Sequence, residues 1–235
     1  GGWVGQVDVP AGAFTAIAAG IVHSCGIRAD STAECWGDNE YGQVDAPEGA
    51  FTAIAAGIVH SCGIRADSTA VCWGDNEYGR ADAPAGAFTA IAAGIVHSCG
   101  IRADSTAECW GDNDDGEADA PAGAFTAIAA GTYHSCGIRA DNTAVCWGYN
   151  RWGRADAPAG AFTAIAAGWD HSCGIRADST AECWGGGFRS RADAPAGAFT
   201  AIAAGHEHSC GIRADNTAEC WHYTTSLPAG VFWAY

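Results

Sequence analysis

Short apolar runs alternate with polar, glycine-containing turns along the whole chain. The run Phe14–Gly20 (FTAIAAG) is too short for a helix of ordinary length and ends in glycine, so we predict a strand. Two further short runs follow at His23–Arg28 and Ala33–Gly37, with the polar stretch Ala29–Thr32 between them. This pattern predicts a hairpin after the first strand, and therefore an antiparallel meander.

The same pattern recurs at a fixed spacing of 37 residues. Its six copies begin at Phe14, Phe51, Phe88, Phe125, Phe162 and Phe199. A period of roughly 20–50 residues is typical of solenoids, propellers and arrays, in which no unit buries its apolar side alone. We therefore expect one all-β domain over residues 1–235, a closed β-propeller of six blades with three to four strands each. A seven-bladed or open arrangement is the alternative.

The two ends of the chain carry incomplete copies. Residues 5–10 (GQVDVP) match the run 42–47 (GQVDAP), which ends in proline and is the weakest strand of its unit, as an outer edge strand should be. The sixth copy lacks this run after Trp221, so we expect an N-terminal strand, residues 3–10, to complete the last blade and close the ring. Residues 228–235 (PAGVFWAY) imitate the start of a further copy and have no assigned place.

Each copy contains two cysteines ten positions apart. If residues 29–31 form a three-residue loop, Cys25 lies opposite Cys35, and opposed Cβ atoms are within about 4.5–5.5 Å, close to disulfide reach. Position 31 then needs a left-handed backbone. We expect six disulfides, which pair Cys25 with Cys35, Cys62 with Cys72, Cys99 with Cys109, Cys136 with Cys146, Cys173 with Cys183 and Cys210 with Cys220.

The paired cysteines also indicate where the protein works. Strict pairing of an even number of cysteines is typical of a secreted protein or another oxidising compartment outside the cytoplasm. The sequence has no signal peptide, so we expect a mature chain from which the targeting segment is missing. The formal charge of −16, with no lysine, argues against nucleic acid, and no apolar run reaches the roughly 18 residues of a membrane span. We expect a monomer.

The motifs AAGxxHSC (residues 18–25) and WGDNxxGQ (residues 36–43) resemble the repeats of the regulator-of-chromosome-condensation family. The resemblance covers essentially the whole chain and is closest to short bacterial members, among them a secreted inhibitor protein of β-lactamases. It implies a β-propeller, usually seven-bladed, that acts as a protein-binding platform. This chain differs in having six copies, a cysteine pair in each hairpin, and Asp-Ser or Asp-Asn where the family often has Asp-Gly.

The copies differ from one another at two places. One is the pair before the histidine, Ile21–Val22 in the first copy and His206–Glu207 in the last, and the other is the loop that begins at residue 38 in the first copy. Because successive strands run in opposite directions, both places should lie at the same end of every blade. Loops on a rigid scaffold are where binding residues are expected. Copies four to six are rich there in aromatic residues and arginine, which dominate interface hot spots, whereas copies one to three carry acidic loops.

We therefore predict a protein-binding module without enzymatic activity that uses this variable face. Its candidate contact residues are Tyr41, Tyr78, Tyr133, Tyr149, Arg151, Trp152, Trp169, Asp170, Phe188, Arg189, His206 and Glu207. Neutral drift after duplication is another interpretation, but it should mostly give small polar residues. A carbohydrate-binding lectin is an alternative, although a lectin should keep one site in each copy. A designed or consensus-like scaffold without a natural ligand is the other.

One histidine per copy could form a ring, at positions 23, 60, 97, 134, 171 and 208. A six-fold ring is too wide for one ion to reach its members, so we expect these histidines to bond to backbone at the top of a strand. The run Asp112–Gly116 lacks the bidentate glutamate of a calcium loop. We expect no metal and no cofactor, and a metal- or histidine-dependent lyase is the least favoured hypothesis.

Overall fold

The computed structural model describes residues 5–186 and 194–222. In these residues six antiparallel sheets of three strands follow one another along the chain, each in the order first, second, third strand. We number the sheets as blades one to six. The strands are β1 Phe14–Ala19, β2 His23–Arg28, β3 Ala33–Gly37, β4 Phe51–Ala56, β5 His60–Arg65, β6 Ala70–Gly74, β7 Phe88–Ala93, β8 His97–Arg102, β9 Ala107–Gly111, β10 Phe125–Ala130, β11 His134–Arg139, β12 Ala144–Gly148, β13 Phe162–Ala167, β14 His171–Arg176, β15 Ala181–Gly185, β16 Phe199–Ala204, β17 His208–Arg213 and β18 Ala218–His222.

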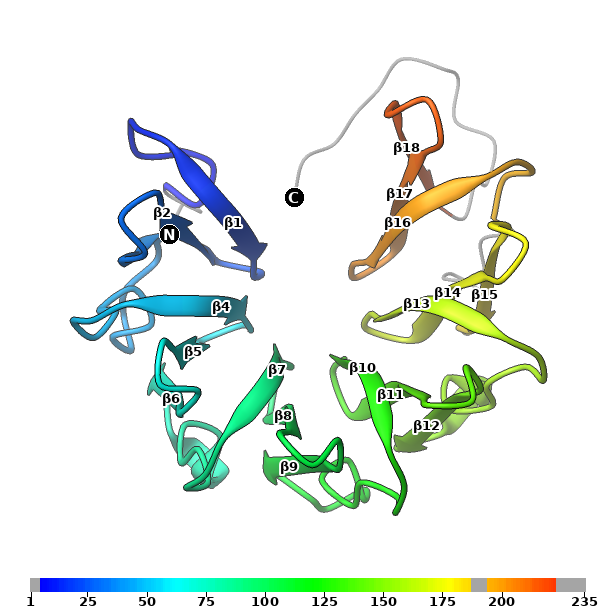
Figure 1. The fold of residues 1–235 in the computed structure, drawn as a ribbon, viewed down its shortest axis with the longest axis horizontal. Helices are drawn as coiled ribbons and strands as arrows, with labels where there is room; N and C mark the ends of the chain where they lie inside the picture. Colours follow the sequence, from blue (N-terminus) through cyan, green and yellow to red (C-terminus); the bar gives the residue numbers. More distant parts are fainter. Residues whose placement is uncertain (1–4, 187–193, 223–235) are drawn as a thin grey trace.

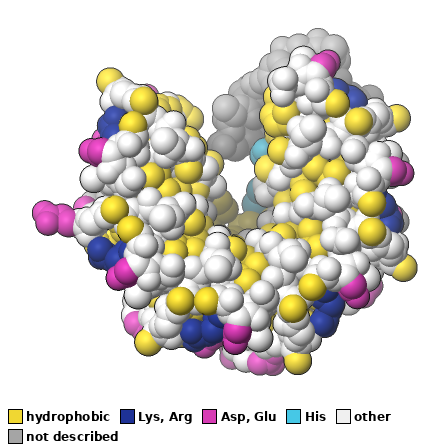
Figure 2. Space-filling model, in the orientation of Figure 1, with side chains coloured by type: hydrophobic (Ala, Val, Ile, Leu, Met, Phe, Trp, Pro, Cys, Tyr) yellow, Lys and Arg dark blue, Asp and Glu magenta, His cyan; other side chains and the backbone are white. Residues whose placement is uncertain are grey.

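The blades are arranged around a common centre, and the arrowheads of the six first strands point toward it (Figure 1). The predicted all-β propeller of six blades is therefore confirmed. On the face shown in Figure 2, charged side chains lie mainly on the outer rim, and apolar side chains gather between the blades and toward the centre. No helix among the described residues is long and apolar enough to cross a membrane.

The hairpin within each blade has the predicted register. Cys25 lies directly opposite Cys35 on β2 and β3, and the backbone N–H of Arg28 donates to Thr32 O at 2.8 Å. Ser31 closes the loop with a φ of 71°, in the left-handed region. All six expected disulfides are present, each between the second and third strands of one blade. Such a set of disulfides is typical of proteins in an oxidising compartment.

The hydrophobic core lies between blades rather than within them. Phe51 at the start of β4 is buried against Cys25 and Ile27 of the preceding blade and against Trp73 of its own blade. The same cluster recurs at the three following junctions, and the isoleucine, phenylalanine and tryptophan recur at the fifth. Full burial of such a side chain contributes roughly 1.5–3 kcal/mol, so the repeated phenylalanine joins neighbouring blades.

The inner ends of the first strands also meet through backbone. The N–H of Ile21 donates to Gly57 O at 3.3 Å, and the N–H of Ile95 donates to Gly131 O at 3.2 Å. A Cβ atom added at Gly57 would lie 2.3 Å from the carbonyl oxygen of Gly94. Glycine is therefore required where the chain leaves the first strands of blades one to five, because a side chain would collide with the next blade.

Each described sheet has three strands, within the expected three to four, and the fourth run at Gln43 forms no strand of its own. The run at Gln43 instead adds a carbonyl oxygen to the next blade, where it accepts hydrogen bonds from Ser61 Oγ and Trp73 Nε1, both at 3.0 Å. Gln6 does the same for the first blade, because its carbonyl accepts from Ser24 and Trp36. Residues 3 and 4 lie outside the described residues, and a contribution of residues 3–10 to the last blade stays a prediction.

The sixth and first blades present surfaces that are covered at the other junctions. Ile17 on β1 is 56% exposed, and His208 on β17 is exposed, although the histidines that begin the other second strands are buried. Between the described parts of these two blades no bond corresponds to the histidine–serine bonds of the other junctions. Closure of the ring at this point stays a prediction.

Candidate functional site

The two variable segments of the first five copies meet at one end of the blade. The backbone N–H of Asp38, which opens the variable loop, donates to the carbonyl of Val22 in the variable pair at 3.0 Å. The same bond joins Tyr149 to Tyr133 at 2.7 Å in the fourth copy. It also recurs in copies two, three and five. The predicted gathering of both segments on one face is therefore confirmed.

An open hollow of about 210 Å³ lies on this face, where blades four and five meet. Its walls come from the variable pair before β11, the loop after β12 and the variable pair before β14. Six of the seven lining residues are candidates from the sequence, and Arg154 is the seventh. The lining residues are Tyr133, Tyr149, Arg151, Trp152, Arg154, Trp169 and Asp170.

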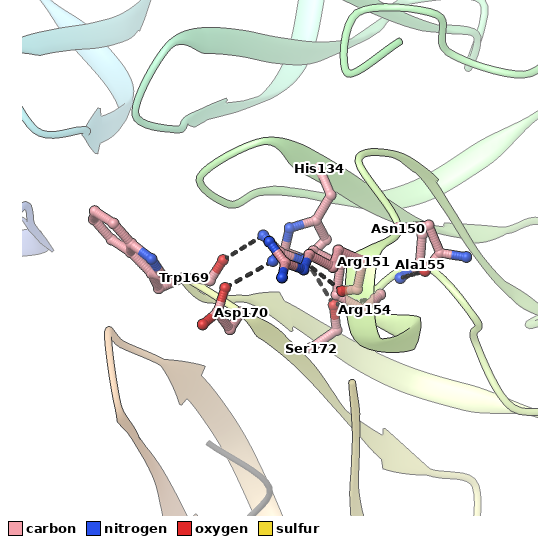
Figure 3. Close-up of polar contacts among 8 residues, drawn as sticks. All are labelled: His134, Asn150, Arg151, Arg154, Ala155, Trp169, Asp170 and Ser172. Atoms are coloured by element: carbon pink, nitrogen blue, oxygen red, sulfur yellow. Dashed lines mark hydrogen bonds and ion pairs between the residues drawn. The ribbon is translucent and has the colours of Figure 1, made fainter. Parts of the chain in front are cut away.

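Arg154 holds the two sides of the hollow together (Figure 3). Its guanidinium is 2% exposed and donates from Nη2 to Asp170 Oδ1 at 2.7 Å and from Nη1 to Trp169 O at 3.0 Å. Nε donates to the carbonyl of Arg151 at 3.3 Å. A buried charge is tolerated when it is paired and its hydrogen bonds are made. Arg154 therefore links the loop of blade four to the variable pair of blade five.

Aromatic rings form part of the walls of the hollow. The rings of Tyr133 and Tyr149 meet edge to face with centroids 6.3 Å apart, and the guanidinium of Arg154 lies 4.9 Å from the Tyr149 centroid. The Trp152 side chain is 49% exposed and carries the guanidinium of Arg151 over its ring at 4.4 Å. An exposed aromatic ring beside an arginine offers a partner both apolar area to bury and a positive charge to contact.

The remaining candidates lie around this hollow or elsewhere on the face. His206 packs against Trp169 with the ring centroids 4.3 Å apart and the planes tilted by 47°, which extends the aromatic surface toward blade six, and exposed Glu207 lies beside it. Tyr41 and Tyr78 are 49% and 58% exposed in the corresponding loops of copies one and two, away from the hollow. Phe188 and Arg189 lie outside the described residues.

The repeated histidines join blades, but mainly through side chains and not through backbone as expected. Nε2 of His60 lies 2.8 Å from the hydroxyl of Ser98 in the next blade. In the described copies only His23 also bonds a carbonyl, that of Ile58. Burial lowers the pKa of His60 to about 3 and that of His97 to about 4, so both are neutral at pH 7. Among the described residues, no three His, Cys, Asp or Glu side chains gather to hold a metal.

Arg154 is the functional candidate that the sequence reasoning missed. It occupies the last place of the variable loop, which reads Gln43, Arg80, Glu117 and Arg154 in copies one to four. Variation between neutral, positive and negative side chains at one place of the repeat is a usable signal. The burial itself could not be predicted, because it depends on the following blade.

Fold and variable face together define a repeat propeller that presents its differences at one end. The profile of the regulator of chromosome condensation (RCC1) repeat matches five segments, residues 14–43, 51–80, 88–117, 125–153 and 162–190. The chain therefore belongs to the RCC1 repeat family. A sequence comparison with curated proteins gave no match.

Solved structures with the same fold include two plant receptor ectodomains. The ectodomain of the receptor kinase CR4 from Physcomitrella patens is 30% identical with a TM-score of 0.81, over 97% of this chain and 68% of that one. The CRINKLY WD40 ectodomain of ACR4 from Arabidopsis thaliana is 28% identical with a TM-score of 0.75, over 92% and 83% of the chains. Yeast RCC1 (Prp20) bound to Kap60 is 16% identical with a TM-score of 0.75, over 89% and 70%, and shows the fold alone.

Proposed function

We propose that the protein is a non-enzymatic binding module that recognises another protein through the variable face of its propeller. The hollow between blades four and five is the anchor of this interface. One observation carries the proposal: six residues singled out by variation among the copies line a single hollow around a buried arginine. Drift in solvated loops should mostly give small polar residues, whereas five of these six are aromatic or arginine.

The chemistry of the hollow favours a protein partner. Tryptophan, tyrosine and arginine are the residue types that dominate interface hot spots, and the central Arg154–Asp170 pair is held in place before binding. The chain as a whole has a formal charge of −16, whereas the hollow holds two arginines and one aspartate. Its local charge therefore favours a partner surface that offers carboxylates or carbonyls rather than arginine and lysine.

The disulfides and the net charge also bear on where the protein acts and on its class of partner. Six disulfides support secretion or another oxidising compartment outside the cytoplasm, and the acidic surface disfavours nucleic acid. The structure of yeast RCC1 (Prp20) with Kap60 is an example of a protein with this fold in a protein complex. We propose that this chain acts as a monomer.

The test begins with affinity capture from the extracellular material of the source organism and identification of partners by mass. Dissociation constants for a purified partner are then measured with the wild type, Trp152→Ala and the control Tyr78→Ala. Trp152 and Tyr78 occupy the same place in two loops, but only Trp152 lines the hollow. We expect Trp152→Ala to weaken binding by more than about tenfold, as for a hot-spot residue, and Tyr78→Ala to leave it unchanged.

Both variants should keep the melting temperature of the wild type, since both side chains are exposed. Wild-type affinity in Trp152→Ala and in Trp169→Ala would reject the hollow as the anchor. Specific binding on a glycan array, lost in Trp152→Ala, would replace the proposal by the lectin alternative.

A further inference from the structure

The variable loops of the first four copies each contain a four-residue turn, which occurs in two conformations. In the second and fourth copies, residues 76–79 and 150–153, the third residue is left-handed: Tyr78 has φ 64° and ψ 9°, and Trp152 has φ 67° and ψ 18°. In the first and third copies, residues 39–42 and 113–116, the third residues are Tyr41 and Asp115, and neither has positive φ. A positive φ at this place is typical of a type II turn, whereas a type I turn has a negative φ.

The two classes of turn differ in which backbone group forms a hydrogen bond with the buried side chain at the end of the loop. In the first copy, Gln43 Oε1 accepts a hydrogen bond from the N–H of Tyr41 at 2.9 Å. In the third copy, Glu117 Oε2 accepts from the N–H of Asp115 at 2.9 Å. Both acceptor side chains are fully buried. In these two turns the N–H of the third residue therefore points inward.

In the other class a buried arginine occupies the same place. Arg80 Nε donates to the carbonyl of Glu77 at 2.9 Å, and Arg154 Nε donates to the carbonyl of Arg151 at 3.3 Å. In these two turns the carbonyl of the second residue therefore points inward, whereas in the first and third copies the N–H of the third residue points inward. Rotating this one peptide group by half a turn converts a type I turn into a type II turn.

The first two copies form a matched comparison within the chain. Residues 38–42 and 75–79 have the same sequence, DNEYG, and differ in turn class. The frame around them is also the same, because the Asn39 side chain donates to Asp45 at 2.9 Å and the Asn76 side chain donates to Asp82 at 2.9 Å. The turn residues themselves therefore do not select the conformation.

We propose that the buried residue at the end of each loop, Gln43, Arg80, Glu117 or Arg154, selects the turn class by the hydrogen bond it makes. An acceptor side chain captures the N–H and gives a type I turn, and an arginine captures the carbonyl and gives a type II turn. Placing a bulky residue in the left-handed region is unfavourable, and hydrogen bonds from a charged donor are strong enough to offset that cost.

This buried residue, which we call the selector, also sets the direction of the exposed third residue of the turn. The half turn of the peptide changes φ of the third residue, and with it the direction of the Tyr78 or Trp152 side chain. At the hollow, Arg154 selects the turn and also binds Asp170 of the next blade. Arg154 is therefore the specificity-determining residue of this surface, a consequence that rests on the proposed function, whereas the turn selection does not.

The test uses reciprocal single swaps in the full chain, Gln43→Arg and Arg80→Gln. Crystal structures, or the strength of the nuclear Overhauser effect from Hα of the second turn residue to the N–H of the third, report the turn class. We expect Tyr78 to leave the left-handed region in Arg80→Gln and Tyr41 to enter it in Gln43→Arg. The control Val44→Ala removes the neighbouring difference between the two copies and should leave the turn at residues 39–42 unchanged.

Unchanged turns in both swaps, or a changed turn in Val44→Ala, would overturn the selector. If Arg80→Gln does not fold, Gln43→Arg decides alone. Arg154→Gln then separates the turn selection from the proposed binding function, because the turn class is measured in the protein alone, without a partner. A converted turn at Trp152 with unchanged partner affinity would keep the selector and reject its role in binding, and a converted turn with affinity reduced by more than tenfold would support both.

Discussion

The imidazole Nε2 of His60 lies 2.8 Å from the hydroxyl oxygen of Ser98 in the next blade. Ser98 gives its own hydrogen to the carbonyl of Arg80 at 3.1 Å, so the imidazole must be the donor in the first bond. The equivalent pairs at the four other described junctions are His23–Ser61, His97–Ser135, His134–Ser172 and His171–Ser209. The second and third repeats are thus joined by one buried chain of hydrogen bonds, which runs from His60 through Ser98 back to Arg80, because Arg80 ends the loop of the second copy.

Removing the serine hydroxyl should destabilise the propeller. Ser98→Ala leaves the N–H of His60 buried without an acceptor, which typically costs about 1–3 kcal/mol. The matched control is Ser24→Ala, at the same repeat position on the first blade, where no histidine bond is made among the described residues. Denaturant unfolding should give a larger loss for Ser98→Ala, and equal losses in the two variants would contradict the assignment.

The buried histidines should make stability depend on pH. Burial, helped by the nearby Arg80 guanidinium, lowers the pKa of His60 from its ordinary 6.5 to about 3, and burial lowers that of His97 to about 4. The unfolded chain binds more protons than the folded chain between these values and 6.5. The contribution of the neutral histidines is therefore complete above pH 6.5 and is lost as the pH falls from 6.5 toward 4.

The measurement is the free energy of unfolding in urea between pH 7 and pH 4. Protonation also reduces the repulsion among the acidic groups, so the histidine effect is read as a difference between proteins. His60→Asn keeps a neutral side chain and should have a shallower pH dependence than the wild type. Parallel curves for the two proteins would reject the proposed role of His60.

The disulfides should stabilise each hairpin through the unfolded state. Cys99 and Cys109 are ten positions apart, and closing a loop of this size is worth roughly 2–3 kcal/mol in the chain-entropy model. The double substitution Cys99→Ser and Cys109→Ser should lower the free energy of unfolding by about this amount under oxidising conditions. With all disulfides reduced, the double variant and the wild type should become nearly equal. A difference that persists after reduction would point to packing rather than to the crosslink.

Sequence periodicity predicted the local parts of the fold because they depend on few neighbouring residues. The opposition of Cys25 and Cys35 follows from a three-residue loop, and the left-handed Ser31 follows from the same loop. The meeting of the variable pair and the variable loop follows from strand direction alone. These features needed no knowledge of how one blade packs on the next.

Features that involve two blades could not be predicted in this way. Whether Gln43 forms a fourth strand depends on Ser61 and Trp73, which lie in the following repeat and bind its carbonyl. The burial of Arg154 depends in the same way on Asp170. A single repeat read in sequence order contains neither partner, so the strand number was predicted only as three to four and Arg154 was missed.

The two turn classes predict opposite effects of the same substitution in two identical sequence contexts. Tyr41 and Tyr78 are both exposed and both preceded by Asp-Asn-Glu and followed by Gly, but only Tyr78 is left-handed. Glycine removes the left-handed penalty of about 1–2 kcal/mol and adds about 0.5–1 kcal/mol of backbone entropy cost at either position. Tyr78→Gly should therefore be neutral or slightly stabilising, and Tyr41→Gly should be destabilising.

Urea unfolding of the two variants gives the comparison directly, since the lost side chains are the same. We expect the free energy of unfolding of Tyr78→Gly to exceed that of Tyr41→Gly by about 1–2 kcal/mol. Combining each change with the corresponding selector swap extends the test. In Gln43→Arg the loss caused by Tyr41→Gly should shrink, and in Arg80→Gln the advantage of Tyr78→Gly should disappear. Equal stabilities of the two glycine variants would mean that the left-handed turn at Tyr78 carries no strain, and the arginine would then have nothing to offset.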